Sequence, residues 1–93
     1  MRESVVQRQI LLAMRAEGAY AVVTIATGDN GTPDILGVYQ GAGVGIEVKT
    51  GRRKPTPLQQ QRIKEILQAG GRAGVARSTE EALAIMKGEG DGE

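Results

Sequence analysis

The chain has 93 residues and a formal net charge of +1, its only aromatic residues are two tyrosines, and it contains neither cysteine nor histidine. This length suits one small domain and excludes a second, and the missing residue types exclude disulfides, thiolate nucleophiles, histidine bases and the usual zinc sites. Since no apolar run approaches the roughly 20 residues of a membrane span and the N-terminus lacks the apolar stretch of a signal peptide, we expect a cytosolic protein.

The N-terminal half predicts a helix followed by three strands. Ser4 and Gln7 have the spacing of a capping box, and apolar residues then recur with helical spacing until Gly18. Residues 20–26 are rich in β-branched types and precede a turn-like segment, 28–31, so they predict a strand. Further strands are predicted at about 34–40 and 44–50, joined by a glycine-rich turn at 41–43.

The C-terminal half predicts a helix, a short strand and a last helix. Thr56, Pro57 and Gln59 have the positions of an N-cap, a first helical residue and a capping-box partner, which starts a helix that runs to about residue 69. Residues 72–77 predict a strand, and a capping box at 78–81 opens a helix to about residue 87. We expect residues 1–87 to form one domain and the acidic, glycine-rich residues 88–93 to be disordered.

This order of elements predicts an α/β fold with a mixed sheet. Short turns make the first three strands an antiparallel meander, and the helix at 57–69 then crosses over to the last strand.

Charge is distributed unevenly along the chain. Residues 49–77 carry eight basic side chains and one acidic one, whereas residues 1–48 carry three basic and five acidic, and residues 78–93 carry one basic and five acidic. The basic middle segment suits a polyanion such as nucleic acid, because phosphate contacts by Lys and Arg supply affinity without sequence preference. A solvated basic face is the alternative.

Three charged residues are predicted to converge. Glu47 and Lys49 alternate with apolar residues in the third predicted strand, so they share one face. If the second and third strands pair as a hairpin, Asp34 lies opposite this stretch. Two carboxylates together usually need a cation between them, and a lysine beside it can assist attack of water on a phosphate. The alternative is an ordinary surface ion pair between Glu47 and Lys49.

Arg52, Arg53 and Lys54 directly follow the strand that carries Glu47 and Lys49. A loop there would lie at the edge of the site, where its charges could hold DNA phosphates. A solvated loop is again the alternative. The scarcity of aromatic residues argues against recognition of single strands by base stacking.

Several short motifs together resemble one known family, the virus-type replication-repair nuclease (VRR-NUC) domain. They are the segments 28–35, 45–51, 56–59, 69–71 and 77–81, and the resemblance extends from about Glu3 to Leu83. It implies a restriction-endonuclease-like fold of the PD-(D/E)xK superfamily with an αβββαβ core, dependence on Mg²⁺ or Mn²⁺, and cleavage of branched or structured DNA.

The resemblance also implies residue roles. Asp34, Glu47 and the backbone carbonyl of Val48 would bind the metal, and Lys49 would be catalytic. Glu3 matches a metal-facing glutamate of the first helix and Gln59 a glutamine that reaches toward the lysine or the scissile phosphate. Each has a second explanation: Glu3 as an acid just outside a helix N-terminus capped by Ser4, and Gln59 as the capping-box partner of Thr56.

We therefore expect a metal-dependent endonuclease similar to Holliday junction resolvases, acting on branched DNA as a homodimer. The small size matches versions of this domain that occur alone in bacteriophages, so the resemblance also implies a phage or prophage origin. A non-catalytic nucleic-acid-binding module of the same fold is the main alternative, although such a module has no need for two acids where phosphate approaches. A flap nuclease or an RNA nuclease also remains open.

Overall fold

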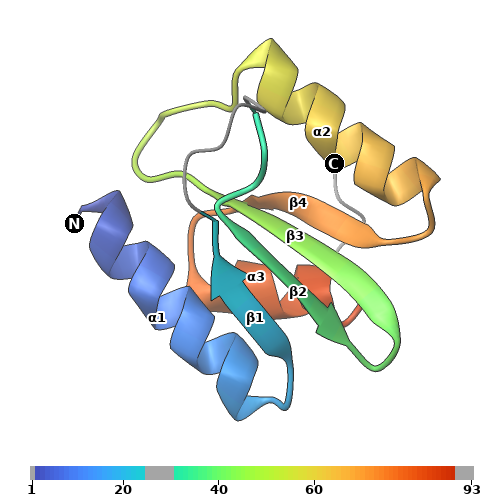
Figure 1. Ribbon diagram of the computed structural model, residues 1–93. Helices are drawn as coiled ribbons and strands as arrows, with labels where there is room; N and C mark the ends of the chain where they lie inside the picture. The colour runs from blue at the N-terminus through green and yellow to red at the C-terminus, as the bar shows by residue number, and fades with distance from the viewer. Residues whose placement is uncertain (1, 25–30, 90–93) are drawn as a thin grey trace.

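The computed structural model describes residues 2–24 and 31–89. Helices and strands follow one another as α1 (Glu3–Ala16), β1 (Tyr20–Val23), β2 (Ile35–Tyr39), β3 (Ala42–Val48), α2 (Pro57–Gln68), β4 (Arg72–Ala76) and α3 (Thr79–Met86) (Figure 1). The order of elements predicted from the sequence is confirmed.

The four strands form one mixed sheet in the order β1-β2-β3-β4. The first three strands are antiparallel, and β2 turns into β3 through a two-residue loop, Gln40 and Gly41, both with positive φ. β4 then pairs with β3 in parallel, which requires the crossover that α2 supplies. The predicted α/β fold with its mixed sheet is confirmed.

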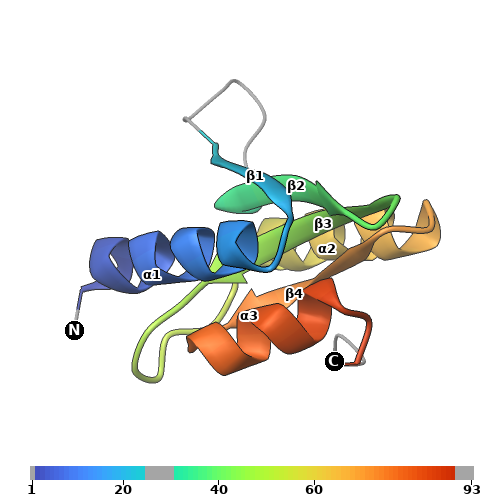
Figure 2. The ribbon, with the colours of Figure 1, turned by 90° about the horizontal axis from the view of Figure 1, so that it is seen from below.

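The helices cover the two faces of the sheet unequally. Because side chains alternate along β3, Val44, Ile46 and Val48 point to one face, and Gly45 and Glu47 point to the other. α1 and α3 lie on the first face and α2 on the second, where it packs on β3 and β4 (Figure 2). The described helices leave open the half of the second face that β1 and β2 form.

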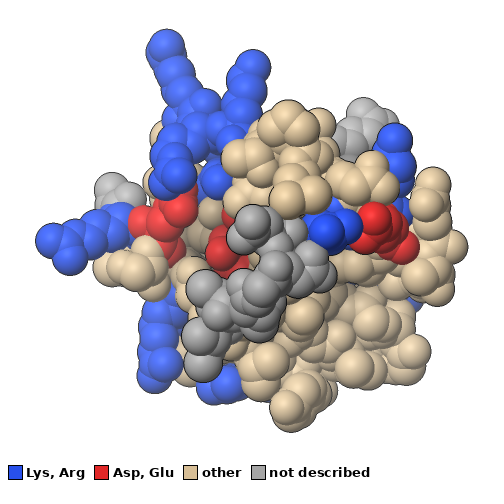
Figure 3. All heavy atoms as spheres, turned by 45° about the horizontal axis from the view of Figure 1, so that its top comes forward, with Lys and Arg blue, Asp and Glu red and all other residues tan. Residues whose placement is uncertain are grey.

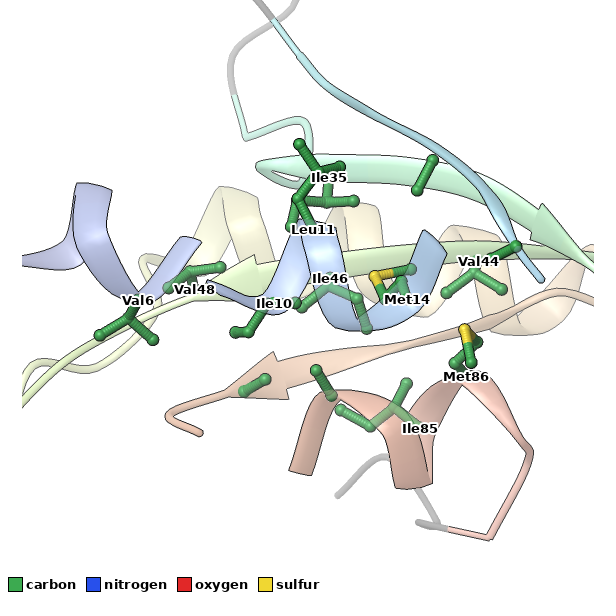
Figure 4. Packing of buried hydrophobic residues seen from close by; sticks show 14 residues of the cluster. Val6, Ile10, Leu11, Met14, Ile35, Val44, Ile46, Val48, Ile85 and Met86 are labelled. Carbon is green, nitrogen blue, oxygen red and sulfur yellow. The ribbon is translucent and has the colours of Figure 1, made fainter. Parts of the chain in front are cut away.

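The main core lies between the sheet and the pair α1 and α3 and is aliphatic, as the composition requires. Ile10 and Met14 of α1 belong to one cluster with Ile46 of β3 and Met86 of α3, and all four are fully buried (Figure 4). Each such side chain contributes about 1.5–3 kcal/mol when it leaves water. This core fixes β3, the strand that carries Glu47.

A close approach at Gly45 sets the position of α2. A Cβ atom at this glycine would lie 2.7 Å from Ile66 Cδ1 of α2 and 3.2 Å from Pro33 Cγ. The missing side chain therefore lets α2 pack directly on β3, next to Glu47 and next to the residue before Asp34.

Three predicted boundaries differ from the structure by two residues. α1 begins at Glu3 and its N-cap is Arg2, so the capping box predicted at Ser4 is wrong. β3 begins at Ala42, because the turn occupies residues 40 and 41, and it ends at Val48, so Lys49 lies just beyond the strand. The predicted strand at 20–26 and the predicted disordered tail extend outside the described residues, at 25–26 and at 90–93. Within the described part of the tail, the Gly88 and Glu89 amides donate to carbonyls of α3.

Candidate active site

The backbone at Asp34 is held in place by Thr24, the residue that directly follows β1. The Asp34 carbonyl accepts a 2.9 Å hydrogen bond from the Thr24 amide, and the Thr24 hydroxyl donates to the Pro33 carbonyl at 2.8 Å. The half-buried Asp34 carboxylate then accepts a 2.8 Å hydrogen bond from the backbone amide of Val48, through Oδ2. This bond joins the start of β2 to the end of β3.

The bond to Val48 marks the point where β2 and β3 part. Their last backbone pair is Ile35 with Ile46. The Lys49 amide donates to the Ala76 carbonyl of β4, so the backbone groups of Lys49 face β4. Backbone groups of successive residues face opposite sides of a strand, so the Val48 amide and carbonyl both face β2. On that side the Asp34 carboxylate accepts the hydrogen bond from the Val48 amide. The Val48 carbonyl therefore faces the same side of β3 as this carboxylate.

Glu47 and Lys49 are both buried, with 2% and 5% of their surfaces exposed. Lys49 Nζ lies 3.7 Å from Glu47 Oε2, which is an ion pair longer than a hydrogen bond. Glu47 Oε1 is buried and has no hydrogen-bond partner within residues 2–24 and 31–89. A buried oxygen without a partner is costly, so a bond from a bound group to Glu47 Oε1 would be energetically favoured.

The surroundings of Glu47 raise its pKa from 4.5 to about 7. Burial makes the largest contribution, followed by the negative charge of Asp34, whereas the positive charge of Lys49 lowers the pKa. A hydrogen bond to Asp34 and the charge of Glu3 add smaller increases. Near neutral pH, Glu47 is thus poised between its protonated and ionised forms, which is common at functional sites.

Glu3 lies in the first turn of α1 and pairs with Arg53 of the loop after β3. Its charge acts on Glu47, yet no group of three or more acidic side chains in the described chain lies close enough together to hold a metal. The structure therefore joins Asp34 and Glu47 directly and leaves Glu3 at the rim. A metal-facing role for Glu3 stays a prediction.

Gln59 forms the capping box expected from the sequence. Its side-chain Oε1 accepts a hydrogen bond from the Thr56 backbone amide at 2.9 Å, and the Gln59 backbone amide donates to the Thr56 hydroxyl at 3.1 Å. The side chain is thus engaged at the start of α2, and a catalytic role for Gln59 stays a prediction.

Arg52, Arg53 and Lys54 are exposed in the loop between β3 and α2. We call residues 51–54 the basic loop. On the face drawn in Figure 3, Lys and Arg side chains stand around a group of acidic side chains. The Arg53 amide closes a turn onto the Thr50 carbonyl at 3.2 Å, and the Arg53 guanidinium reaches Glu3.

Arg77 is a further residue of this region, and no role was predicted for it from the sequence. Its guanidinium donates to the Gly51 carbonyl at 3.2 Å, so it ties the basic loop to the end of β4. Gly51 has φ +60°, which favours glycine there. The signal was available: β3 and β4 are parallel, so the residues that follow them lie at the same edge of the sheet.

No helix in the described part of the chain is long and apolar enough to cross a membrane.

No family model matches this sequence, and neither does any curated protein. Solved structures do match the fold. One, described as a VRR_NUC domain, superposes with a TM-score of 0.74 and 24% sequence identity over 91% of this chain and 94% of that one. Another is Hjc, a Holliday junction resolvase from Archaeoglobus fulgidus, with a TM-score of 0.64 and 20% identity over 81% of this chain and 67% of that one.

At these identities the comparisons establish the fold. Both matched proteins are similar to this chain across most of its length, and the VRR_NUC match is nearly complete in both directions. The αβββαβ order, the mixed sheet and these matches agree, and the chain has the restriction-endonuclease-like fold of the VRR-NUC domain.

Proposed function

We propose that this protein is a metal-dependent endonuclease that hydrolyses phosphodiester bonds in branched DNA. The observation that carries the proposal is the pair of acids, half-buried Asp34 and buried Glu47, beside the buried Lys49. Burial and the negative charge of Asp34 raise the pKa of Glu47. One oxygen of Glu47 also lacks a partner within the described chain. A divalent cation would relieve both conditions at once.

The donor set fits a hard cation. The site offers carboxylate and backbone oxygens, and the chain has no histidine or cysteine to add, which suits Mg²⁺ or Mn²⁺. Asp34 and Glu47 would hold the ion, with the Val48 carbonyl as a further ligand and Glu3 reaching it from α1. When bound, the ion supplies Lewis-acid chemistry for phosphodiester hydrolysis.

Lys49 would act on the reacting phosphate. Its ammonium group is fixed beside Glu47 and is excluded from bulk water. It would therefore stabilise the negative charge that grows on the phosphate during attack more strongly than an exposed lysine could. It can also orient the attacking water, whose oxygen forms the new bond to phosphorus while the leaving oxygen takes up a proton. Arg52 and Lys54 would hold phosphates that flank the cut.

Branched DNA is the preferred substrate class because one matched structure, from A. fulgidus, is a Holliday junction resolvase, and because the cations of the basic loop suit phosphates rather than base edges. A four-way junction needs two symmetric cuts, so we also propose a homodimer. Exposed apolar side chains on the open half of the sheet, Tyr20 and Val38, with 68% and 49% of their surfaces exposed, are consistent with a protein contact.

A panel of labelled substrates tests the proposal. Flaps, splayed arms, four-way junctions and plain duplexes of DNA, together with RNA versions, are incubated with Mg²⁺, Mn²⁺ or EDTA. We expect cleavage of a branched DNA only when metal is present. Tight binding without cleavage of any member would instead support a non-catalytic module, and preference for flaps or RNA would replace the substrate class.

A further inference from the structure

A groove of about 660 Å³ runs between α2 and the outer side of β4. One wall is a stripe of α2 with helical spacing, formed by Gln60, Ile63, Lys64 and Leu67. Val75 of β4 lies on the other side. No role for this groove was predicted from the sequence, and the candidate active site does not include it.

The groove continues from the basic loop. Pro55, at one end of the groove, directly follows Lys54. Arg77, which also lines the groove, reaches back to the Gly51 carbonyl at 3.2 Å. A polymer held by the basic loop would therefore meet the groove as the next surface along its path.

The lining combines cations with an aliphatic surface. Lys64 and Arg77 are positive, and Ile63, Leu67 and Val75 are apolar. Glu81 is the one acid among the described lining residues, and its Oε1 accepts a 2.7 Å hydrogen bond from the Arg77 amide at the start of α3, which offsets its charge. This combination suits a ligand with negative groups along one side and flat apolar groups along the other.

We propose that the groove holds unpaired nucleotides of a single-stranded DNA arm next to the cut. This inference rests on the proposed function and adds a strand-binding site to it. The volume is that of a small-molecule pocket, which is enough for nucleotides of one strand. Phosphates would lie against Lys64 and Arg77, and bases would contact the aliphatic side chains of Leu67 and Val75 without aromatic stacking. A protein segment is disfavoured because the groove continues from a surface of three basic side chains.

The test compares two DNA ligands that differ only in a single-stranded tail. Fluorescence anisotropy with EDTA measures binding without cleavage, at several salt concentrations, for a blunt duplex and for the same duplex with the tail. The variants are Lys64→Gln and Leu67→Ser, both at exposed positions on α2. Arg8→Gln, an exposed cation of α1 outside the groove, is the matched control.

We expect the tail to raise the affinity of the wild type several-fold. Lys64→Gln should remove most of this gain and lower the slope of log affinity against log salt by about 0.7 for tailed DNA, as expected when one phosphate of a single strand is no longer neutralised. Leu67→Ser should reduce the gain without changing the slope, and Arg8→Gln should change neither. Circular dichroism confirms that each variant is folded.

Equal affinity of the wild type for both ligands, or an equal loss on both in Lys64→Gln, would overturn the proposal. So would light scattering that shows Lys64→Gln dissociating a protein complex, because the groove would then bind protein. If no substrate is cleaved but the tail effect is present, the nuclease proposal fails while the groove still binds a strand.

Discussion

At the scale of single residues, Glu47 dominates the chemistry of the site. Its side chain lies on the face that α2 covers, with Asp34 and Lys49 as its charged neighbours, and one oxygen has no partner within the described chain. Burial favours the neutral form of this carboxyl group, and a bound cation would favour the ionised form. An ionised carboxylate without a cation raises the free energy of the folded protein. The residues around Glu47 thus link stability, pH and metal.

The first prediction concerns the stability of the metal-free protein. Because the folded pKa of Glu47 is about 7 and its ordinary value is 4.5, the folded state holds a proton that the unfolded state releases between these values. The contribution is fully present below pH 4.5 and is lost as pH rises through 7. At 1.36 kcal/mol per unit, the free energy of unfolding should fall by about 3 kcal/mol across this window.

Denaturant titrations at pH 4.5 to 8 measure this fall, and Glu47→Gln is the control. The difference between wild type and variant isolates Glu47 from the other acids. We expect the variant to gain relative stability as pH rises, and added Mn²⁺ to stabilise the wild type selectively at pH 8. Parallel curves for the two proteins would show that Glu47 is not electrostatically perturbed.

Lys49→Ala gives the second prediction. Removing the ammonium group should lower cleavage by about 10²–10³-fold, the effect of losing one group that stabilises developing charge. Metal affinity should fall little, because Lys49 binds no cation. Single-turnover rates and calorimetric titration with Mn²⁺ separate the two effects. A variant with normal turnover would return Lys49 to a structural ion pair.

The residue-scale geometry was only partly predictable. Alternation along a strand and pairing in a hairpin place Asp34 opposite Glu47, and the sequence shows both patterns. The bond from the Val48 amide to Asp34 was not predictable, because it depends on where β2 and β3 part. The start of α1 was missed because Ser4 and Gln7 have the spacing of a capping box that the structure does not form. The pair of Glu3 with Arg53, 50 residues away in sequence, was not predictable either.

At the scale of elements, the site depends on how closely α2 approaches β3. Glycine at position 45 allows this approach, and Ile66 and Pro33 occupy the space that a Cβ would need. Both elements were predictable from the sequence but their packing was not, since a single glycine in a strand also fits a bulge or a weak strand. The turn at Gln40 was likewise missed, because positive φ is uncommon outside glycine.

The third prediction follows from this packing. Gly45→Ala should destabilise the fold by about 1–3 kcal/mol, the usual effect of overpacking. Ile66→Val removes Cδ1, the atom nearest the new methyl group, so the double variant should lose less stability than the two single variants combined. Denaturant unfolding of the four proteins measures the coupling. Additive losses would mean that α2 does not rest on Gly45.

The basic loop gives the fourth prediction. Replacing Arg52 and Lys54 with Gln keeps the pair of Arg53 with Glu3, and should weaken binding of duplex DNA regardless of sequence. The slope of log affinity against log salt should drop by about 0.9 for each phosphate that is no longer neutralised. Arg8→Gln again serves as control. An unchanged slope in the double variant would mean that the loop is simply solvated.

At the scale of the whole molecule, a small aliphatic domain leaves apolar surface exposed. Tyr20, Val22 and Val38 lie on the open half of the sheet, and α1 exposes Leu12. Composition predicted an aliphatic core of limited size, but it could not show which face would remain uncovered. That depends on α2 lying over β3 and β4.

The fifth prediction is therefore dimerisation. Light scattering at micromolar concentration should give twice the 9.8 kDa mass of the chain, and Val38→Lys should shift the protein toward monomer while preserving its fold. A monomeric mass with and without DNA would remove the homodimer and favour a substrate cut once, such as a flap.

The central claim is that Asp34 and Glu47 hold a metal that drives cleavage of branched DNA. The most direct measurement is the single-turnover cleavage of a labelled branched substrate by wild type and Asp34→Asn, purified side by side, with and without Mn²⁺. We predict metal-dependent cleavage by the wild type and a loss of at least about 100-fold in the variant, with DNA binding retained. Equal cleavage by the two proteins, or cleavage that persists in EDTA, would contradict the assignment.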